Sequence, residues 1–355
     1  MSEARPIRVL MAAPPANRLV GGGAAVQLAQ TARHLPEYGI EVGYFDPWRR
    51  YAPGDADLVH IFGAYMATYD LADRLADLGW PLAVSTIFFT RRSPFFVRTV
   101  RRFEALSKRF VGGIWTDYGV ASRICARAAA VLPNTSEEAH LVEAGFGVPG
   151  ERITVIPNGV EDHFHTAAPD LFRETYGLED IILCVANIGS YRKNVLGLIE
   201  ALAEIDHPAV IIGKVFDNDY ARRCLAAAER NPRLRIIDGL PHDSPLLASA
   251  YAASTVFALP AFFETPGIAA LEAALAGARV VITPHGGTRD YFRDQAVYAE
   301  PTSVTAIRDA IREALAKRED NGLRERVWRE YRWTRVAERT AAVYRRIVDG
   351  GNTTG

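Results

Sequence analysis

The chain has 355 residues, of which 49% are hydrophobic and 23% are charged, and its formal charge is −1 from 41 basic and 42 acidic residues. This near balance excludes a global electrostatic attraction to nucleic acid, and the length favours two domains over one. The three cysteines are scattered and show no metal-ligand spacing, so we expect a reducing, cytoplasmic environment and no disulfide framework.

The N-terminal apolar run at 7–12 is broken early by Pro14 and Pro15, so it does not predict a signal peptide. No apolar run approaches the roughly 18 residues that a membrane-spanning helix needs. We therefore expect a cytoplasmic protein, or one that lies on the inner face of a membrane without crossing it.

Short apolar runs alternate with amphipathic segments along the first half, a pattern typical of parallel α/β architecture. A helix is predicted over 24–39 and is closed by Gly39. The predicted strands of this half are 7–12, 40–45, 57–62, 81–89, 128–135 and 152–159.

The same alternation restarts in the second half, after a segment at 157–169 that is rich in Pro, Gly and polar residues. The predicted strands are 181–187, 209–213, 234–239, 254–260 and 278–283, and the predicted helices are 194–205, 220–230 and 267–277. A last helix is predicted over 323–348, with no strand after it. Two sets of strands, each with its own helices, predict two Rossmann-like domains.

The segment 261–277, AFFETPGIAALEAALAG, carries two acids in an otherwise small and apolar run. Thr265 is expected to cap a helix with Pro266 at its first position, while Gly267 lets a backbone approach closely. Glu264 then lies at the carboxyl end of a parallel strand, where ligands bind in doubly wound sheets, and Glu272 lies about two turns into the helix. The helix N-terminus offers N–H groups to an anion. The alternative is a helix with a solvated edge.

Two further segments combine a loop with a helix N-terminus. Arg192 and Lys193 precede the helix that follows the strand at 181–187, where cations can meet phosphates; exposed basic residues at a helix start are the alternative. Gly22 and Gly23 precede the helix at 24–39 and allow a backbone to approach a pyrophosphate, with a plain turn as the alternative.

The segment ETPGIAALEA resembles the E-x7-E signature of family 4 retaining glycosyltransferases, which have the GT-B fold. The pair Lys193-Asn194 is similar to that family's KG or KN motif, and RLVGGG…YGIEV is similar to its N-terminal glycine pattern. The segments at 128–164 and 282–301 also resemble the family, and the matches follow the family's order along most of the chain.

The resemblance implies a metal-independent, retaining glycosyltransferase without a resident cofactor. It would move a sugar from a nucleotide-diphosphate sugar to a glycan, lipid-linked or small-molecule acceptor, as in polysaccharide biosynthesis. It implies domains at 1–165, for the acceptor, and 166–329, for the donor, facing each other across a cleft, with a C-terminal helix at 330–355 packing back on the first.

The implied catalytic residues are Glu264, Lys193 and Arg192. Glu264 would face donor sugar hydroxyls, Glu272 the ribose, and Lys193 the diphosphate. The implied donor-binding set is Gly22, Gly23, Lys193, Glu264, Pro266, Gly267, Ile268 and Glu272, and Gly286 and Gly287 would lie nearby.

The chain departs from the family at two places. The early arginine is missing, so Arg192 or Asn187 would take its place, and Phe88 stands near the position of an active-site histidine. His60, at another strand end, reads as a core or rim histidine. These departures keep open a non-catalytic GT-B partner subunit. A sugar-nucleotide epimerase is a further alternative, but its carboxylate and histidine set cannot be placed.

The segment 91–110 has seven Arg or Lys and one acid. Phe96, Val100, Phe103 and Phe110 fall on one helical face, so a peripheral membrane contact is one interpretation. A helix docked on its own domain by that apolar stripe is the other. The acidic tripeptides at 55–57 and 217–219 read as ordinary loops, and we expect no metal site.

Overall fold

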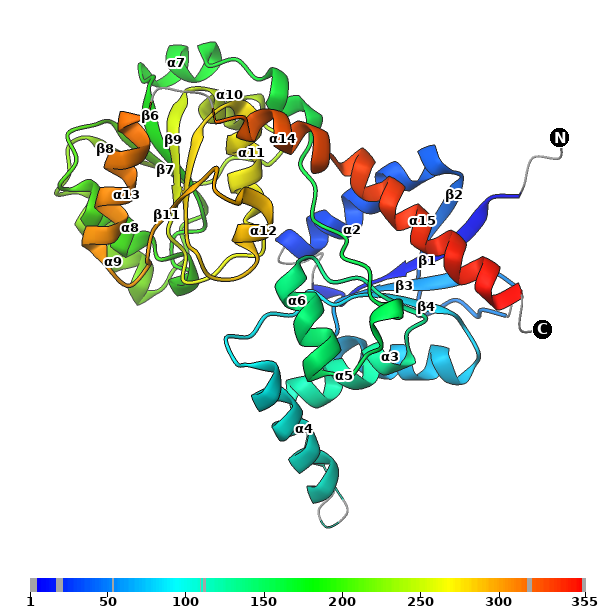
Figure 1. The fold of residues 1–355 in the computed structure, drawn as a ribbon. Coiled ribbons are helices and arrows are strands. Elements are labelled where there is room, and N and C mark those ends of the chain that lie inside the picture. The colour runs from blue at the N-terminus through cyan, green and yellow to red at the C-terminus, as the bar shows by residue number, and fades with distance from the viewer. Residues whose placement is uncertain are drawn as a thin grey trace. The chain divides into compact units, whose positions relative to one another are not determined.

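The computed structural model describes residues 5–16, 22–52, 54–108, 110, 113–317 and 321–352. The chain forms two compact units (Figure 1). Unit 1 comprises Met1–Gly159 and Trp333–Gly355, and unit 2 comprises Val160–Arg332. The chain therefore passes from one unit to the other after Gly159 and again after Arg332, each within six residues of the boundaries expected from the sequence.

Unit 1 contains a five-stranded parallel sheet in the order β2-β1-β3-β4-β5. Its strands are β1 (Ile7–Ala12), β2 (Ile40–Tyr44), β3 (Leu58–Phe62), β4 (Leu82–Ser85) and β5 (Ala130–Val131). All residues of β3 and β4 are buried, as expected for central strands with helices on both faces.

The helices of unit 1 separate its strands in sequence. They are α2 (Gly23–His34), α3 (Met66–Asp77), α4 (Pro94–Ser107), α5 (Asp117–Arg127), α6 (Ser136–His140) and α15 (Trp333–Asn352), with short 3-10 or π turns at Leu35–Tyr38, Leu141–Gly145 and Gly150–Arg152. The side chains of Ser93 and Thr116 cap α4 and α5 by accepting backbone N–H groups. The final helix, α15, packs against α2 (Figure 1).

Unit 2 contains a six-stranded parallel sheet in the order β11-β10-β9-β6-β7-β8. Its strands are β6 (Ile181–Val185), β7 (Ala209–Ile212), β8 (Leu234–Ile237), β9 (Ser254–Leu259), β10 (Arg279–Ile282) and β11 (Val297–Tyr298). The short edge strand β11 is an addition to the five strands that the sequence predicts.

The unit 2 helices are α7 (Asp170–Tyr176), α8 (Val195–Leu202), α9 (Asp219–Ala228), α10 (Pro245–Ala252), α11 (Ile268–Ala276), α12 (Thr288–Phe292), α13 (Val304–Ala316) and α14 (Leu323–Glu330). Two short 3-10 turns occur at Asp162–Thr166 and Tyr191–Lys193. Both units thus have a Rossmann-like, doubly wound organisation. Among the described helices, none has the length and apolar character needed to cross a bilayer.

The predicted strand over 152–159 is wrong. Ile153 forms a single bridge to Val131, and Thr154 and Ile156 donate N–H groups to the carbonyls of Val131 and Pro133. Pro133 and Pro157 have no N–H group, so a regular ladder cannot continue along this segment.

Three other predicted elements are too long. The strand predicted over 128–135 is reduced to β5, Ala130–Val131. The strand predicted over 81–89 ends at Ser85, because the next turn gives its hydrogen bonds to a carboxylate: Thr86 Oγ1 and the N–H of Phe88 both donate to Glu138. The helix predicted over 323–348 is two helices, α14 and α15. It breaks where the Tyr331 carbonyl accepts the N–H of Val160 at 2.8 Å, instead of continuing a helical ladder.

Candidate functional site

The strand order of unit 2 reverses between β6 and β9. Loops that leave the carboxyl ends of two such strands diverge around a crevice, which is where ligands bind in doubly wound sheets. The loop after β6 carries Arg192 and Lys193, and the loop after β9 carries Glu264. Arg192 and Lys193 are 72 and 71 positions away from Glu264 in the sequence. All three side chains nevertheless meet at one point of the sheet edge.

Both cations bind the same carboxylate oxygen. Lys193 Nζ lies 2.5 Å and Arg192 Nη1 lies 3.0 Å from Glu264 Oε1, and Arg192 also donates to the carbonyl of Phe263 at 2.9 Å. Glu264 is only 5% exposed, so its charge is compensated by these partners rather than by water. Two cations against one carboxylate leave a surplus of one positive charge, which suits the binding of an anion.

The backbone around Glu264 is held by close contact with a neighbouring loop. The N–H of Glu264 donates to the carbonyl of His285 at 3.1 Å, and Glu264 and Gly286 form an isolated parallel bridge. Gly286 has φ +87°, and a Cβ there would lie 2.1 Å from the Glu264 carbonyl oxygen. Asn194, which follows Lys193 in the loop after β6, also contacts this region. Its Nδ2 donates to the carbonyls of Pro260 and Pro301 at 3.1 and 2.7 Å.

The expected start of the helix after Glu264 needs correction. α11 begins at Ile268, with Gly267 as its N-cap at φ +78°, so Thr265 is not the cap and Pro266 is not the first helical residue. Within the described parts of the chain, the buried Thr265 hydroxyl has no hydrogen-bond partner. Because Gly267 has no side chain, the first N–H groups of α11 are left without a side-chain cap.

Glu272 belongs to a second cluster, and each of its carboxylate oxygens has a partner of its own. Oε1 lies 2.7 Å from His242 Nε2, and Oε2 accepts the hydroxyl of Tyr251 at 2.6 Å. His242 Nδ1 in turn lies 3.3 Å from Glu161 Oε2. The hydrogen bond to Glu272 raises the pKa of His242, and burial, reinforced by the charge of Glu272, raises the pKa of Tyr251.

The two glutamates therefore do not share a hydrogen-bond partner in the contacts described above, although both are buried. Glu264 is engaged by Arg192 and Lys193, and Glu272 by His242 and Tyr251. Sequence reasoning missed His242 and Tyr251. A usable signal existed for His242, because it lies in the loop after β8, at the same carboxyl edge of the sheet.

The other predicted site residues fall into three environments. Pro266 and Gly267 are buried, and Ile268 is half-buried at the start of α11. Gly22 is the N-cap of α2 at φ +108° and Gly23 is the first residue of that helix; both are exposed in unit 1. Asn187 is exposed, unlike Arg192, which contacts Glu264.

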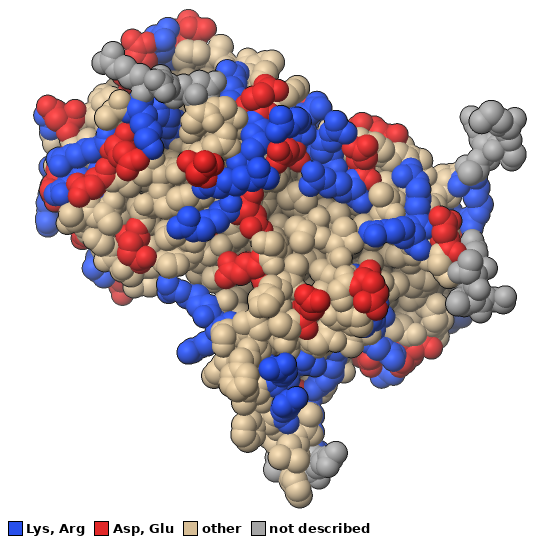
Figure 2. Space-filling model, in the orientation of Figure 1, with Lys and Arg blue, Asp and Glu red and all other residues tan. Residues whose placement is uncertain are grey.

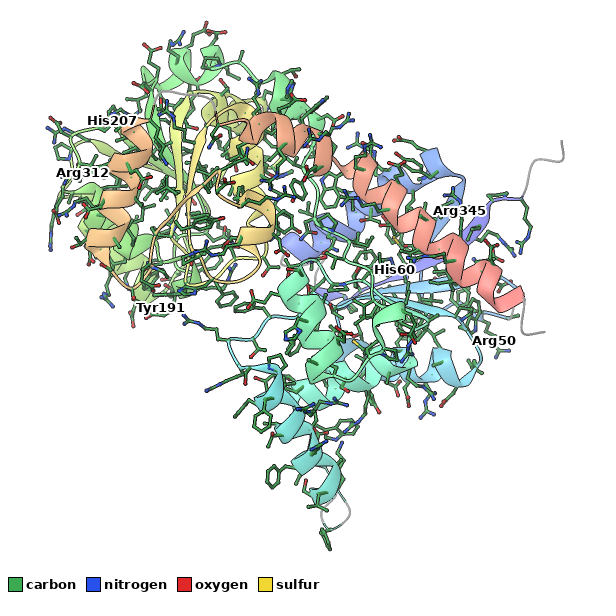
Figure 3. All side chains as sticks on the ribbon, viewed as in Figure 1. Arg50, His60, Tyr191, His207, Arg312 and Arg345 are labelled. Carbon is green, nitrogen blue, oxygen red and sulfur yellow. The ribbon has the colours of Figure 1, made fainter. Side chains whose placement is uncertain are left out.

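His60 is a core residue of unit 1, as the sequence favoured (Figure 3). Its ring nitrogens lie 2.6 Å from the Tyr344 hydroxyl and 3.0 Å from Ser85 Oγ, and burial lowers its pKa to about 3. Phe88, which the sequence aligned with a family histidine, follows Ile87 at φ +46° and packs edge-on against Tyr118 and Phe146.

The acidic tripeptides are engaged in local ion pairs or turns. Asp217 and Asp219 both bind Arg222, at 2.7 and 2.5 Å, and Asp57 binds Arg5 at 2.8 Å. Over the residues that the structure describes, no group of three or more His, Cys, Asp or Glu side chains has a geometry that could hold a metal ion.

Comparison with known proteins assigns a family to both halves of the chain. Residues 172–331 match the model described as Glycosyl transferases group 1, and residues 48–164 match the model described as Glycosyltransferase Family 4. The chain is 26% identical over 274 residues to D-inositol 3-phosphate glycosyltransferase 1 of Catenulispora acidiphila, covering 65% of this chain and 60% of that protein. It is 26% identical over 313 residues to MMP alpha-(1->4)-mannosyltransferase of Mycolicibacterium hassiacum, covering 83% and 72%.

Solved structures support the same fold over the whole chain. The sucrose-phosphate synthase of Thermosynechococcus elongatus superposes with a TM-score of 0.74 at 19% identity, covering 98% of this chain and 100% of that one. HepE of Anabaena in complex with UDP and glucose superposes with a TM-score of 0.70 at 17% identity, covering 95% and 98%. The chain spans between 42% and 60% of the length of four of the curated relatives that it matches.

Proposed function

Because this chain belongs to the family 4 glycosyltransferases of the GT-B fold, we propose that it transfers a sugar from a nucleotide-diphosphate sugar to an acceptor hydroxyl with retention of configuration. The proposed acceptor is a glycan, a lipid-linked saccharide or a small molecule. The observation that carries this proposal is the convergence of Arg192 and Lys193 on buried Glu264 at the switch point of the unit 2 sheet.

The proposed donor diphosphate binds where positive charge is in surplus. Lys193 and Arg192 would contact its oxygens together with the uncapped N–H groups at the start of α11. The orphaned Thr265 hydroxyl is a further polar group in this loop. Glu264, which orients both cations, would accept hydrogen bonds from the sugar hydroxyls. Gly22 and Gly23 of unit 1 are proposed donor contacts from the family pattern alone.

Glu272 is the proposed ligand of the ribose hydroxyls. A carboxylate has about four lone-pair directions, and His242 and Tyr251 occupy two of them, which leaves two for a ribose. His242 is the more accessible partner, with 41% of its side chain exposed. We therefore assign His242 a positioning role, in which it orients the carboxylate of Glu272 toward the ligand.

The proposed chemistry depends on charge that develops as the glycosidic bond breaks. The bonding electron pair goes to the leaving phosphate oxygen, and the acceptor hydroxyl attacks the anomeric carbon from the same face. Its proton passes to the departing phosphate. Lys193, Arg192 and the α11 N-terminus would stabilise the negative charge, and preorganised groups of this kind contribute several kcal/mol. The reaction as proposed uses neither a protein nucleophile nor a bound metal.

A thermal-shift panel with UDP, GDP, ADP and CMP, with and without Mg²⁺, tests the donor site. A ligand at 100 times its Kd adds roughly 2.7 kcal/mol to the stability of the folded protein. We expect one diphosphate to raise the melting temperature equally with and without Mg²⁺. Glu272→Ala should lose this shift, His242→Gln should reduce it, and Glu200→Ala, which removes an exposed glutamate of the same unit, should retain it.

Turnover separates an enzyme from a partner subunit that binds without catalysis. The sugar nucleotide of the base found in the panel is incubated with candidate acceptors, and release of nucleoside diphosphate is measured. Glu264→Ala and Lys193→Ala should lower kcat more than they weaken binding. A wild-type protein that binds the nucleotide but never turns it over would support the partner subunit. No shift with any nucleotide would contradict the donor site itself.

A further inference from the structure

The helix α4 presents two opposite faces, and only one of them packs on unit 1. Val97 is fully buried, Glu104 is 3% exposed, and Arg101 donates to the carbonyl of Gly145 at 2.7 Å. At about 100° per residue, these three side chains point to one side of the helix. The docking stripe expected from Phe96, Val100, Phe103 and Phe110 is therefore wrong, because Val97 and its neighbours make the contact instead.

Large apolar side chains cover the opposite face. Phe95, Phe103 and Leu106 are 70%, 68% and 51% exposed, and Phe96 is 42% exposed. On a regular helix these four residues fall within an arc of about 100°. Phe110, which follows the helix, is 82% exposed. Apolar residues gathered in this way mark a surface that contacts a protein or a membrane.

The charged side chains that the described part of 91–110 places around this face are positive. Arg98 and Arg102 are exposed along one flank of the stripe, and the guanidinium groups of Arg92 and Arg98 lie 5.2 and 5.9 Å from the ring centroids of Phe96 and Phe95. Figure 2 shows tan and blue atoms over the projecting part of α4.

The single acid of 91–110 does not offset these cations at the surface. Glu104 lies on the buried face, where it binds Lys108 at 2.9 Å and also pairs with Arg123. Trp115, beside this cluster, lies under Lys108 and Arg123, at 3.8 and 4.6 Å from its ring centroid. The outward face is therefore aromatic and cationic, without an opposing carboxylate of its own helix.

We propose that this outward face of α4, defined by Phe95, Phe96, Phe103, Leu106, Arg98 and Arg102, binds the surface of an anionic lipid bilayer. A helix of this kind lies in the interface, with its apolar side chains among the acyl chains and its cations at the headgroup phosphates. Charge favours lipid over a protein partner, because an anionic bilayer supplies phosphates along the whole cationic flank. The proposal goes beyond the donor site and does not depend on it.

Sedimentation with vesicles tests the proposal on the full chain. Vesicles of phosphatidylcholine alone are compared with vesicles that contain 30% phosphatidylglycerol. We expect binding to the anionic vesicles only, and weaker binding as the salt concentration rises. Phe95→Ser/Phe103→Ser and Arg98→Glu/Arg102→Glu should each weaken the partition coefficient roughly tenfold or more.

Matched controls come from exposed positions elsewhere in unit 1. Leu78→Ser removes a leucine that is 69% exposed. Arg50→Glu reverses the charge of an exposed residue (Figure 3). Both variants should bind vesicles like the wild type. Unchanged melting temperatures would show that every variant is folded, since all of the substituted side chains lie at the surface.

Three outcomes would overturn the proposal. The first is equal binding of the wild type to neutral and anionic vesicles, or to neither. The second is a loss with Leu78→Ser as large as with Phe95→Ser/Phe103→Ser. The third is a concentration-dependent dimer in analytical ultracentrifugation that Phe95→Ser/Phe103→Ser abolishes while vesicle binding is absent, which would make this face a protein interface. Nucleotide-induced melting shifts report the donor site separately, so the two proposals fail independently.

Discussion

Two glutamates from one short motif have different chemical surroundings. Glu264 precedes α11 and is held by two cations, whereas Glu272 lies inside α11 and is held by a histidine and a tyrosine. Gly267 lies between them in sequence and, at positive φ, is the N-cap of α11. A cation pair suits contact with phosphate and sugar oxygens, and a carboxylate whose partners are one histidine and one tyrosine keeps acceptor positions for a diol, so the surroundings support the separate roles proposed for the two acids.

His60 provides a test of stability at the residue scale. Its pKa is about 3 in the folded protein, against about 6.5 in an unfolded chain, so between these values the unfolded state binds more protons. The stability that neutral His60 contributes is present above pH 6.5 and is lost as the pH falls. We expect the free energy of unfolding to drop by up to about 1.4 kcal/mol per pH unit below pH 6.5 from this residue.

His60→Gln keeps a polar side chain at this position but removes the titration. Urea denaturation at pH 7.5, 6.5, 5.5 and 4.5 should show a shallower loss of stability on acidification for this variant than for the wild type. Parallel pH profiles for the two proteins would show that His60 does not control the acid sensitivity of unit 1.

At the scale of elements, the donor site depends on contact between two loops of unit 2. The loop after β9 carries Glu264 and the loop after β10 carries Gly286, and their backbones touch. A side chain at Gly286 must therefore move the Glu264 backbone. The sequence identified Gly286 only as a glycine near the donor; the structure explains its requirement by close approach and positive φ.

Gly286→Ala should remove nucleotide binding in the thermal-shift panel, because the new Cβ displaces Glu264 and with it the partner of Lys193. Gly277→Ala is the matched control: its φ is +104°, but the nearest atom to an added Cβ is 3.9 Å away, on Arg324. Both variants incur the backbone strain of about 1 kcal/mol, and the control should still bind. Equal binding by the two variants would show that the Gly286 contact does not position Glu264.

At the scale of the whole molecule, the last helix completes the first unit. Trp333 is 2% exposed, and a Cβ at Gly159 would lie 2.5 Å from its ring; Tyr344 reaches His60 from the same helix. Residues from opposite ends of the chain thus form one core, while unit 2 is continuous in sequence. The stability of the two units should therefore respond separately to substitution.

Trp333→Ala should destabilise unit 1 by about 3 to 5 kcal/mol, as is usual when a large aromatic is removed from a core. Limited proteolysis followed by mass spectrometry should then show new cleavage within 5–159, with 160–332 still protected. Trp48→Ala, at a residue that is 93% exposed, is the control and should change stability by less than about 0.5 kcal/mol. Cleavage spread evenly over both units would contradict their independence.

The sequence by itself determined the repeated α/β organisation, most of the strands and the presence of Glu264, Glu272 and Lys193 at strand ends or helix starts. These follow from local hydrophobic periodicity and motif spacing, which act over a few residues. Local pattern failed at 152–159 and at Tyr331, where prolines and a crossing chain segment redirect the backbone hydrogen bonds. Tertiary structure alone decided which side chains meet. Lys193 with Glu264, His242 with Glu272, and the outward orientation of the Phe95 face of α4 all depend on packing between segments far apart in sequence, which sequence periodicity does not encode.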